Sequence, residues 1–221
     1  MQRGDVGQCI AWNLGWLVLA AMWLGPLPHH VLTSFAAHMT LHMGVVAVAA
    51  PLLAVGWAGR RFDPVKNFSW CFSPIVASVG ELIIVWGWHA PRLHHWACFE
   101  TLGFVVEQLM FLLAGLWVWL AAYGGARPRN RQRSGAGVVA LLLTSMHMTF
   151  LGALLALSDR LLFAHHNLGS SAAQLADQQL GGAVMLVIGG ASFLIGGLVL
   201  TRDLMLQIIP RKERLYEATN I

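Results

Sequence analysis

The sequence predicts an all-α fold, a polytopic transmembrane bundle of about six helices. Composition indicates this first, because 57% of the 221 residues are hydrophobic and only 11% are charged. Segment length indicates it next, since a helix needs about 20 apolar residues to cross a bilayer. Segments near this length lie at about 9–25, 33–57, 73–90, 99–123, 137–157 and 177–201. They lack the alternating pattern of barrel strands, which excludes a β-barrel, and we expect a single membrane-embedded domain over residues 1–221.

The first and last segments carry features of their own. Segment 9–25 follows a short head with Arg3 and resembles a signal peptide, but the GPLPHH that follows offers no small-residue cleavage site. We therefore expect it to remain as the first transmembrane helix. Segment 177–201 contains the glycine-rich run VIGGASFLIGG, which is typical of close helix packing in membranes.

Lysine and arginine are distributed unevenly between the two ends of these segments. All but two of the 14 such residues lie before the first segment, between the second and third, between the fourth and fifth, or after the sixth. The exceptions are Arg92 and Arg160. The positive-inside rule then predicts an N-in/C-in topology with both termini in the cytoplasm. This topology also explains the isoelectric point of about 9.4, so we expect no nucleic-acid partner.

Two histidines lie one helical turn apart within segment 33–57, in the sequence HMTLHM. His38 and His42 share a helix face, and Met39 and Met43 follow them on a neighbouring face. Ionisable groups inside a bilayer mark functional sites or require polar partners. Because imidazole and thioether together suit copper, Cu(I) above all, we expect a copper site here. The alternatives are interhelical hydrogen bonding for each histidine and plain packing for each methionine.

Further ionisable residues lie at a similar depth on other segments. A rise of about 1.5 Å per residue places His42 roughly 13 Å and His147 roughly 15 Å below the outer surface. Glu81 and Glu107 lie at about 12 to 14 Å by the same rise. A carboxylate at that depth needs a partner or a proton. We expect His147 and His89 to complete the metal ligands and the two carboxylates to support them.

The expected outer face carries the remaining polar candidates. Asp177 and Gln178 open segment 177–201 on that face, where Asp177 either supports the site or only caps the helix. Paired histidines fall in or beside the three outer loops, and a ligand role for them stays open. These are His29, His30, His94, His95, His165 and His166.

The cysteines predict no dithiol site. Cys9, Cys71 and Cys98 stand singly, without C-x-x-C spacing. Cys98 beside His94 and His95 has the chemistry of a soft-metal ligand, but packing is the favoured interpretation. Phosphate-binding loops, dinucleotide glycine patterns, nucleophile elbows and HExxH motifs are absent from the sequence.

Four stretches together resemble one known family. They are HMTLHMGVVAVAAPLLAVG from His38, WGWHAP at 86–91, MTFLGALLALS at 148–158 and LADQQLGGAVML at 175–186. They are similar to the polytopic CtaG family of cytochrome c oxidase assembly factors, associated with caa-type oxidases. Positions that match its motifs are His38, His42, His89, Asp177 and Gln178. The chain departs from the family at Gln108, where members usually carry histidine, and in its six predicted helices, since members often have one more.

The resemblance implies a function in the maturation of a heme-copper oxidase. It implies a multi-pass protein of the bacterial inner membrane that binds copper, as Cu(I), and delivers it to the catalytic subunits of cytochrome c oxidase. A periplasmic copper donor would be a second partner, and no enzymatic turnover is expected. Three alternatives stay open: a b-type membrane cytochrome with His38 or His42 and His147 as axial ligands, a copper permease, and a structural oxidase subunit.

Overall fold

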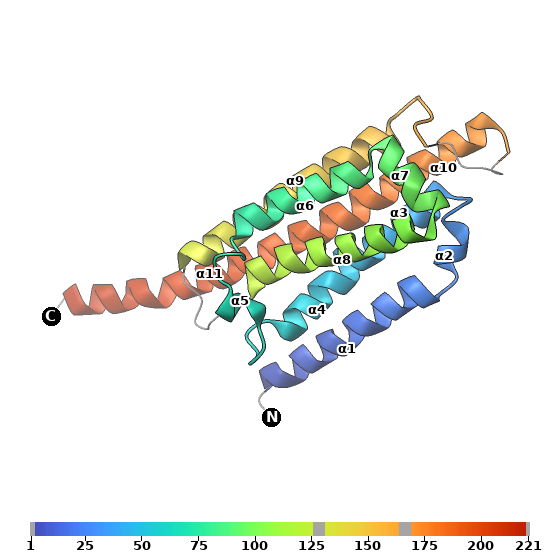
Figure 1. Ribbon diagram of the computed structural model, residues 1–221. Helices are drawn as coiled ribbons and strands as arrows, with labels where there is room; N and C mark the ends of the chain where they lie inside the picture. Colours follow the sequence, from blue (N-terminus) through green and yellow to red (C-terminus); the bar gives the residue numbers. More distant parts are fainter. Residues whose placement is uncertain (1–2, 126–130, 164–168, 220–221) are drawn as a thin grey trace.

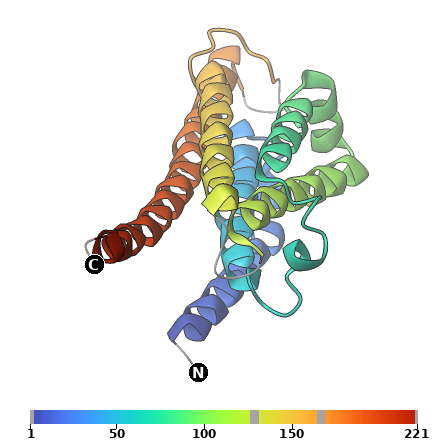
Figure 2. The same ribbon diagram turned by 90° about the vertical axis from the view of Figure 1, so that its left-hand side faces the viewer.

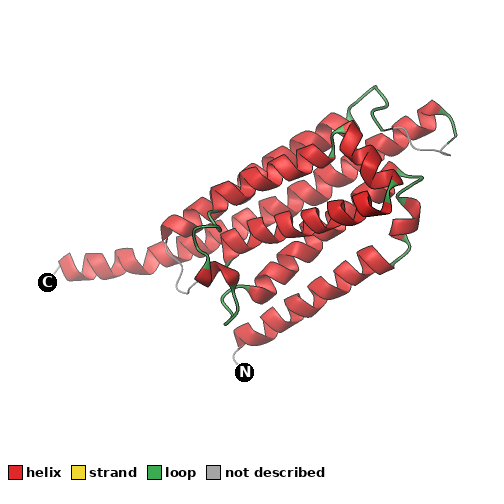
Figure 3. Cartoon of the chain, viewed as in Figure 1, coloured by secondary structure: helices red, strands yellow, loops and turns green. Residues whose placement is uncertain are grey.

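The computed structural model describes residues 3–125, 131–163 and 169–219, and this part of the chain is helical without strands (Figure 3). The helices lie side by side as one bundle (Figure 1). In chain order they are α1 Arg3–Leu24, α2 Leu27–His30, α3 Phe35–Met43, η1 Gly44–Ala49, α4 Ala50–Trp57, α5 Pro64–Asn67, α6 Pro74–Trp88, α7 Pro91–Phe99, α8 Thr101–Tyr123, α9 Arg131–Ala156, α10 Ser171–Val184, η2 Met185–Gly189 and α11 Gly190–Thr219.

The predicted polytopic bundle is confirmed. Within the described ranges, five helical stretches are long and apolar enough to cross a membrane: Val6–His30, Phe35–Trp57, Thr101–Tyr123, Arg131–Ala156 and Ser171–Leu206. The third predicted segment forms α6, which has only 15 residues. The protein is therefore a multi-pass membrane protein in which α6 is shorter than its neighbours.

Several boundaries differ from those expected: α1 begins at Arg3 and not near 9, and α11 ends at Thr219 and not near 201. Helix α9 begins at Arg131 and not near 137, and α10 begins at Ser171, where the Ser170 hydroxyl accepts a hydrogen bond from the Ala173 N–H at 3.4 Å. The first turns of α9 and α10 contain polar residues, so hydropathy alone places the start of each helix too late in the sequence. Helix α7 lies where a loop was expected, because Pro91 at its first turn has the fixed φ that favours helix initiation.

The second transmembrane helix contains a π-helical turn, η1, just before Pro51. Pro51 has no N–H and so cannot donate to the carbonyl four residues earlier, that of Ala47, which therefore needs another donor. The Ser192 hydroxyl of α11 donates to the Ala47 carbonyl at 2.6 Å. A second π-helical turn, η2, contacts η1 across the bundle. Such turns re-aim side chains and are frequent at functional sites.

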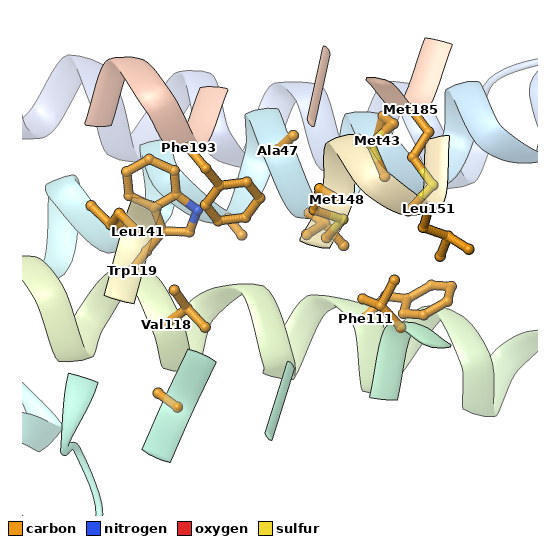
Figure 4. Close-up of a cluster of buried hydrophobic side chains, with 14 of the residues drawn as sticks. Met43, Ala47, Phe111, Val118, Trp119, Leu141, Met148, Leu151, Met185 and Phe193 are labelled. Carbon is orange, nitrogen blue, oxygen red and sulfur yellow. The ribbon is translucent and has the colours of Figure 1, made fainter. Parts of the chain in front are cut away.

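The core between these helices is apolar and closely packed. Figure 4 shows Met43, Phe111, Met148 and Met185 converging there from four elements, and all four are fully buried. Glycines bring α9 and α10 together: a Cβ added at Gly152 of α9 would stand 2.9 Å from the Gly182 carbonyl oxygen of α10. In the glycine-rich run, a Cβ added at Gly190 would collide with Thr149 Cγ2 of α9, so the predicted small-residue packing is present there.

The two ends of the bundle differ in chemistry. Helix α5, both chain termini and the start of α9 lie at one end, where α11 extends beyond the other helices (Figures 1 and 2). This end carries the basic residues Arg60, Arg61, Lys66, Arg131 and Arg133. Helices α2 and α7 and the start of α10 lie at the opposite end, with most of the histidines. Arg127, Arg129, His165 and His166 lie outside the described residues.

Candidate metal centre

The start of α3 is fixed by hydrogen bonds, and this orients its histidines. The Ser34 hydroxyl caps the helix by accepting from the Ala37 N–H at 3.1 Å. With the first turn fixed, His38 and His42 point into the bundle with 1% and 0% of their surface exposed. The sequence therefore positions two imidazoles, one turn apart, inside the protein and away from lipid.

His38 is held by a carboxylate of α8. Its Nε2 lies 3.0 Å from Oε2 and 3.2 Å from Oε1 of Glu107, and both side chains are buried. A carboxylate oxygen accepts, so the Nε2–H of His38 donates. In the neutral ring Nδ1 then carries a lone pair. A carboxylate that fixes a histidine tautomer in this way is typical of metal ligation.

The Nδ1 nitrogen of His38 faces a thiol. Cys98 Sγ lies 3.8 Å from His38 Nδ1 and 3.4 Å from His94 Nε2. The ligand atoms of these three residues all lie within 4.8 Å of one another, and all three side chains are buried. Two imidazole nitrogens and one thiolate sulfur form a soft, low-coordinate set suited to copper or zinc.

This group, His38, His94 and Cys98, is called the upper cluster. A pocket of about 200 Å³ adjoins it at the end of the bundle away from the basic loops. Its lining includes two members of the upper cluster, His94 and Cys98. The lining residues are Pro91, His94, His95, Cys98, Phe99, Leu162 and Phe163.

A second group lies one turn further along α3. His89, the residue after α6, is hydrogen bonded through Nδ1 to the Val85 carbonyl at 2.7 Å, and its Nε2 lies 3.4 Å from Met39 Sδ. The ring centroid of His42 lies 5.5 Å from that of His89 and 3.7 Å from that of Phe111. We call His42, His89 and Met39 the lower cluster.

The other predicted ligands lie elsewhere. His147 Nε2 of α9 lies 3.4 Å from Glu81 Oε2 of α6, both buried, and beside them the hydroxyls of Ser78 and Thr144 are 2.9 Å apart. Met43 lies in the apolar core (Figure 4). The structure thus pairs each predicted carboxylate with a different histidine.

Asp177 and Gln178 act on the backbone around the upper cluster. Asp177 accepts hydrogen bonds from the Ser34 hydroxyl at 2.8 Å and from the N–H groups of Phe35 and Ala36 at 2.6 and 3.3 Å. It therefore caps α3. The expectation that Asp177 opens its own helix is wrong, because α10 begins six residues earlier, at Ser171, and the alternative that it only caps that helix fails with it.

Gln178 holds the chain segment over the pocket. Its Oε1 accepts from the N–H groups of Leu162 and Phe163 at 2.8 and 3.1 Å, and its Nε2 donates to the Arg160 carbonyl at 3.0 Å. The Phe163 ring packs on His94 with centroids 4.5 Å apart. Gln178 thus supports the upper cluster through one aromatic contact.

Sequence reasoning missed His94 and Cys98 as partners of His38. Their i, i+4 spacing, the same spacing as in the HMTLHM motif, would have placed them on one helix face had α7 been recognised. Gln108, the departure from the family pattern, donates from Nε2 to Glu107 Oε2 at 3.3 Å. It thereby supports the carboxylate that holds His38.

Comparison with known proteins gives one match. The family model described as cytochrome c oxidase caa3 assembly factor (Caa3_CtaG) matches residues 1–207. No curated protein and no solved structure matches the chain.

Proposed function

The chain belongs to the family of cytochrome c oxidase caa3 assembly factors, and from this premise we propose that it supplies Cu(I) to a heme-copper oxidase. The recipients in this proposal are the oxidase's catalytic subunits, and a periplasmic protein is the copper donor. The protein works in the bacterial inner membrane and binds its cargo without chemical turnover, so it is not an enzyme.

The upper cluster is the observation that carries this proposal. One thiol and two imidazoles, all buried, hold a soft cation away from water. Three ligands leave a coordination position free for an incoming group, which permits ligand exchange with a partner. A single thiolate also holds copper less tightly than a dithiol, and release is what a copper-supplying protein requires.

The location of the cluster supports the same function. The adjoining pocket is lined largely by residues of α7, and α7 lies at the end of the bundle opposite α5, which contains Lys66 and follows Arg60 and Arg61 (Figure 1). Under the positive-inside rule those residues face the cytoplasm, so the pocket faces the periplasm, where a copper donor would meet it. Release toward a partner within the membrane would use the same end.

Substitution of the thiol tests the proposal most simply. Cys98→Ser keeps the size of the side chain but replaces a soft ligand by a hard one. We expect purified Cys98→Ser protein to bind Cu(I) at least an order of magnitude more weakly and to leave the oxidase poorly active in a strain that carries only this variant. His29→Ala, an exposed histidine of α2 that does not line the pocket, is the matched control and should behave as wild type.

An optical spectrum of the same preparation distinguishes a b-type cytochrome from a Cu(I)-binding protein. A b-type heme held by two histidines absorbs strongly in the Soret region, whereas a protein loaded with Cu(I) is colourless. A Soret band in stoichiometric amount would contradict the copper proposal. Normal Cu(I) affinity and normal oxidase activity with Cys98→Ser would contradict it as well.

A further inference from the structure

We infer that the lower cluster is a second Cu(I) position, with Nε2 of His89, Sδ of Met39 and a ring nitrogen of His42 as ligands. It lies one turn of α3 from the upper cluster, so the chain holds two copper ions in succession along one helix. This inference rests on the proposed function, because it takes Cu(I) as the cargo.

The hydrogen bond of His89 determines which of its nitrogens is available. The Val85 carbonyl can only accept, so the Nδ1 of His89, 2.7 Å away, carries the proton and donates it. In a neutral ring Nε2 is then a bare lone pair. Burial favours the neutral ring, since only 7% of His89 is exposed.

The atom that faces this lone pair carries no hydrogen. Met39 Sδ is a thioether that lies 3.4 Å from His89 Nε2, so two electron-pair donors point at each other. No hydrogen bond can join them while the ring is neutral. A soft cation satisfies both at once: with metal–ligand lengths of about 2.0 Å to nitrogen and 2.3 Å to sulfur, one ion spans 3.4 Å in a bent arrangement.

His42 supplies the third ligand. Its ring is fully buried, and neither ring nitrogen has a hydrogen-bond partner among the described residues. An unpartnered buried nitrogen is costly and calls for an explanation. The ring lies beside His89 and against Phe111, and ligation of the same ion explains why an imidazole occupies this position.

The two clusters differ in charge, and this difference determines which of them binds Cu(I) more tightly. The upper cluster contributes a thiolate and has the Glu107 carboxylate beside His38, so negative groups balance the charge of Cu(I) there. The lower cluster contributes only neutral ligands and leaves a net positive charge in the low-dielectric interior, which is unfavourable. The lower position therefore binds Cu(I) more weakly, and a second equivalent fills it only after the upper position is occupied.

Copper titration of the full-length apo protein in detergent tests this inference. Under anaerobic, reducing conditions and against a chromophoric Cu(I) competitor, we expect two bound equivalents of different affinity in the wild type. Met39→Leu should retain only the tighter equivalent and Cys98→Ser only the weaker one. Met43→Leu, a methionine of the same helix that packs in the core, is the matched control and should retain both.

Selenomethionine labelling gives a direct readout of the ligand. X-ray absorption of the doubly loaded, labelled protein should contain a copper–selenium distance that Met39→Leu removes and Met43→Leu leaves. Equal melting temperatures of the leucine variants and the wild type would exclude misfolding as the cause. Two equivalents bound by Met39→Leu, or a copper–selenium distance unchanged by it, would overturn the inference.

The failure of this inference and the failure of the proposed function give different results. A wild type that binds one equivalent, abolished by Cys98→Ser, contradicts the lower position alone and leaves copper supply intact. A protein that binds no Cu(I), or whose Cys98→Ser variant matures the oxidase fully, contradicts the proposed function itself.

Discussion

At the scale of single residues, the buried histidines differ in the group that determines which ring nitrogen carries the proton. Glu107 fixes the tautomer of His38, and the Val85 carbonyl fixes that of His89. In both cases one ring nitrogen donates a hydrogen bond and the other faces sulfur. In the proposed copper site, the orientation of these two imidazoles therefore depends on Glu107 and on the Val85 carbonyl, which are not themselves ligands.

Substitution of Glu107 should show most clearly that Cu(I) affinity depends on residues that support the ligands. Glu107→Gln keeps an acceptor for His38 but removes the negative charge, and we expect about 10-fold weaker Cu(I) binding, with Glu107→Ala weaker by about 100-fold. Competition titration measures both. Glu100→Gln, at the exposed start of the same helix, is the control. Unchanged affinity in Glu107→Ala would refute the supporting role.

His147 provides a contrasting case, because it is paired with Glu81 and not with sulfur. His147→Ala should leave a buried carboxylate without a partner and lower stability by about 3–5 kcal/mol, while both copper equivalents remain. The double variant Glu81→Leu/His147→Leu should regain most of the lost stability in a thermal melt. Loss of a copper equivalent in the double variant would instead make His147 a ligand.

At the scale of elements, the region around the upper cluster is held by contacts between helices distant in sequence. Asp177 of α10 caps α3, and Gln178 fixes the segment that places Phe163 on His94. Both act through the backbone. Asp177 and Gln178 thus fix α3 and the segment with Phe163 in position around the proposed ligands.

Substitution of Asp177 separates capping from charge. Asp177→Ala should lower the stability of the protein by about 1 kcal/mol and weaken copper binding through α3. Asp177→Asn keeps an oxygen for the Phe35 and Ala36 N–H groups and should remain close to wild type in both measurements. If Asp177→Asn fails as completely as alanine, the charge itself has a function and capping does not account for this residue.

Much at this scale could be predicted from the sequence, and the reasons for the rest are physical. Hydropathy located the long helices because only their interiors are apolar over about 20 residues. It also predicts similar depths for Glu81 and Glu107. Depth along the membrane normal does not say which way a side chain faces. The histidine that each carboxylate contacts depends on how α6 and α8 are rotated about their axes and on which helices lie beside them. Helix α7 was missed because its polar, nine-residue sequence has no membrane-spanning pattern.

At the scale of the whole molecule, the basic residues and the proposed metal ligands lie at opposite ends of the bundle. The basic loops lie at one end and the upper cluster with its pocket at the other. Uptake and release of copper at a single end require no path through the bundle. This polarity agrees with a protein that serves a partner on one side of the membrane.

The orientation of this polarity can be tested by reporter fusions. A fusion after Arg133 should report the cytoplasm and one after Gln174 the exterior, as the distribution of lysine and arginine predicts. Paired reporters that are active on opposite sides of the membrane provide the measurement. The reverse result at either point would place the upper cluster on the cytoplasmic side and contradict supply from the periplasm.

The copper content of the oxidase purified from a strain that lacks this gene tests the central claim most directly. Copper supply predicts that the oxidase polypeptides are made but contain little copper, and that added copper, or the wild-type gene but not Cys98→Ser, restores metal and activity. An oxidase that is fully loaded with copper and fully active in the deletion strain under copper limitation would contradict it.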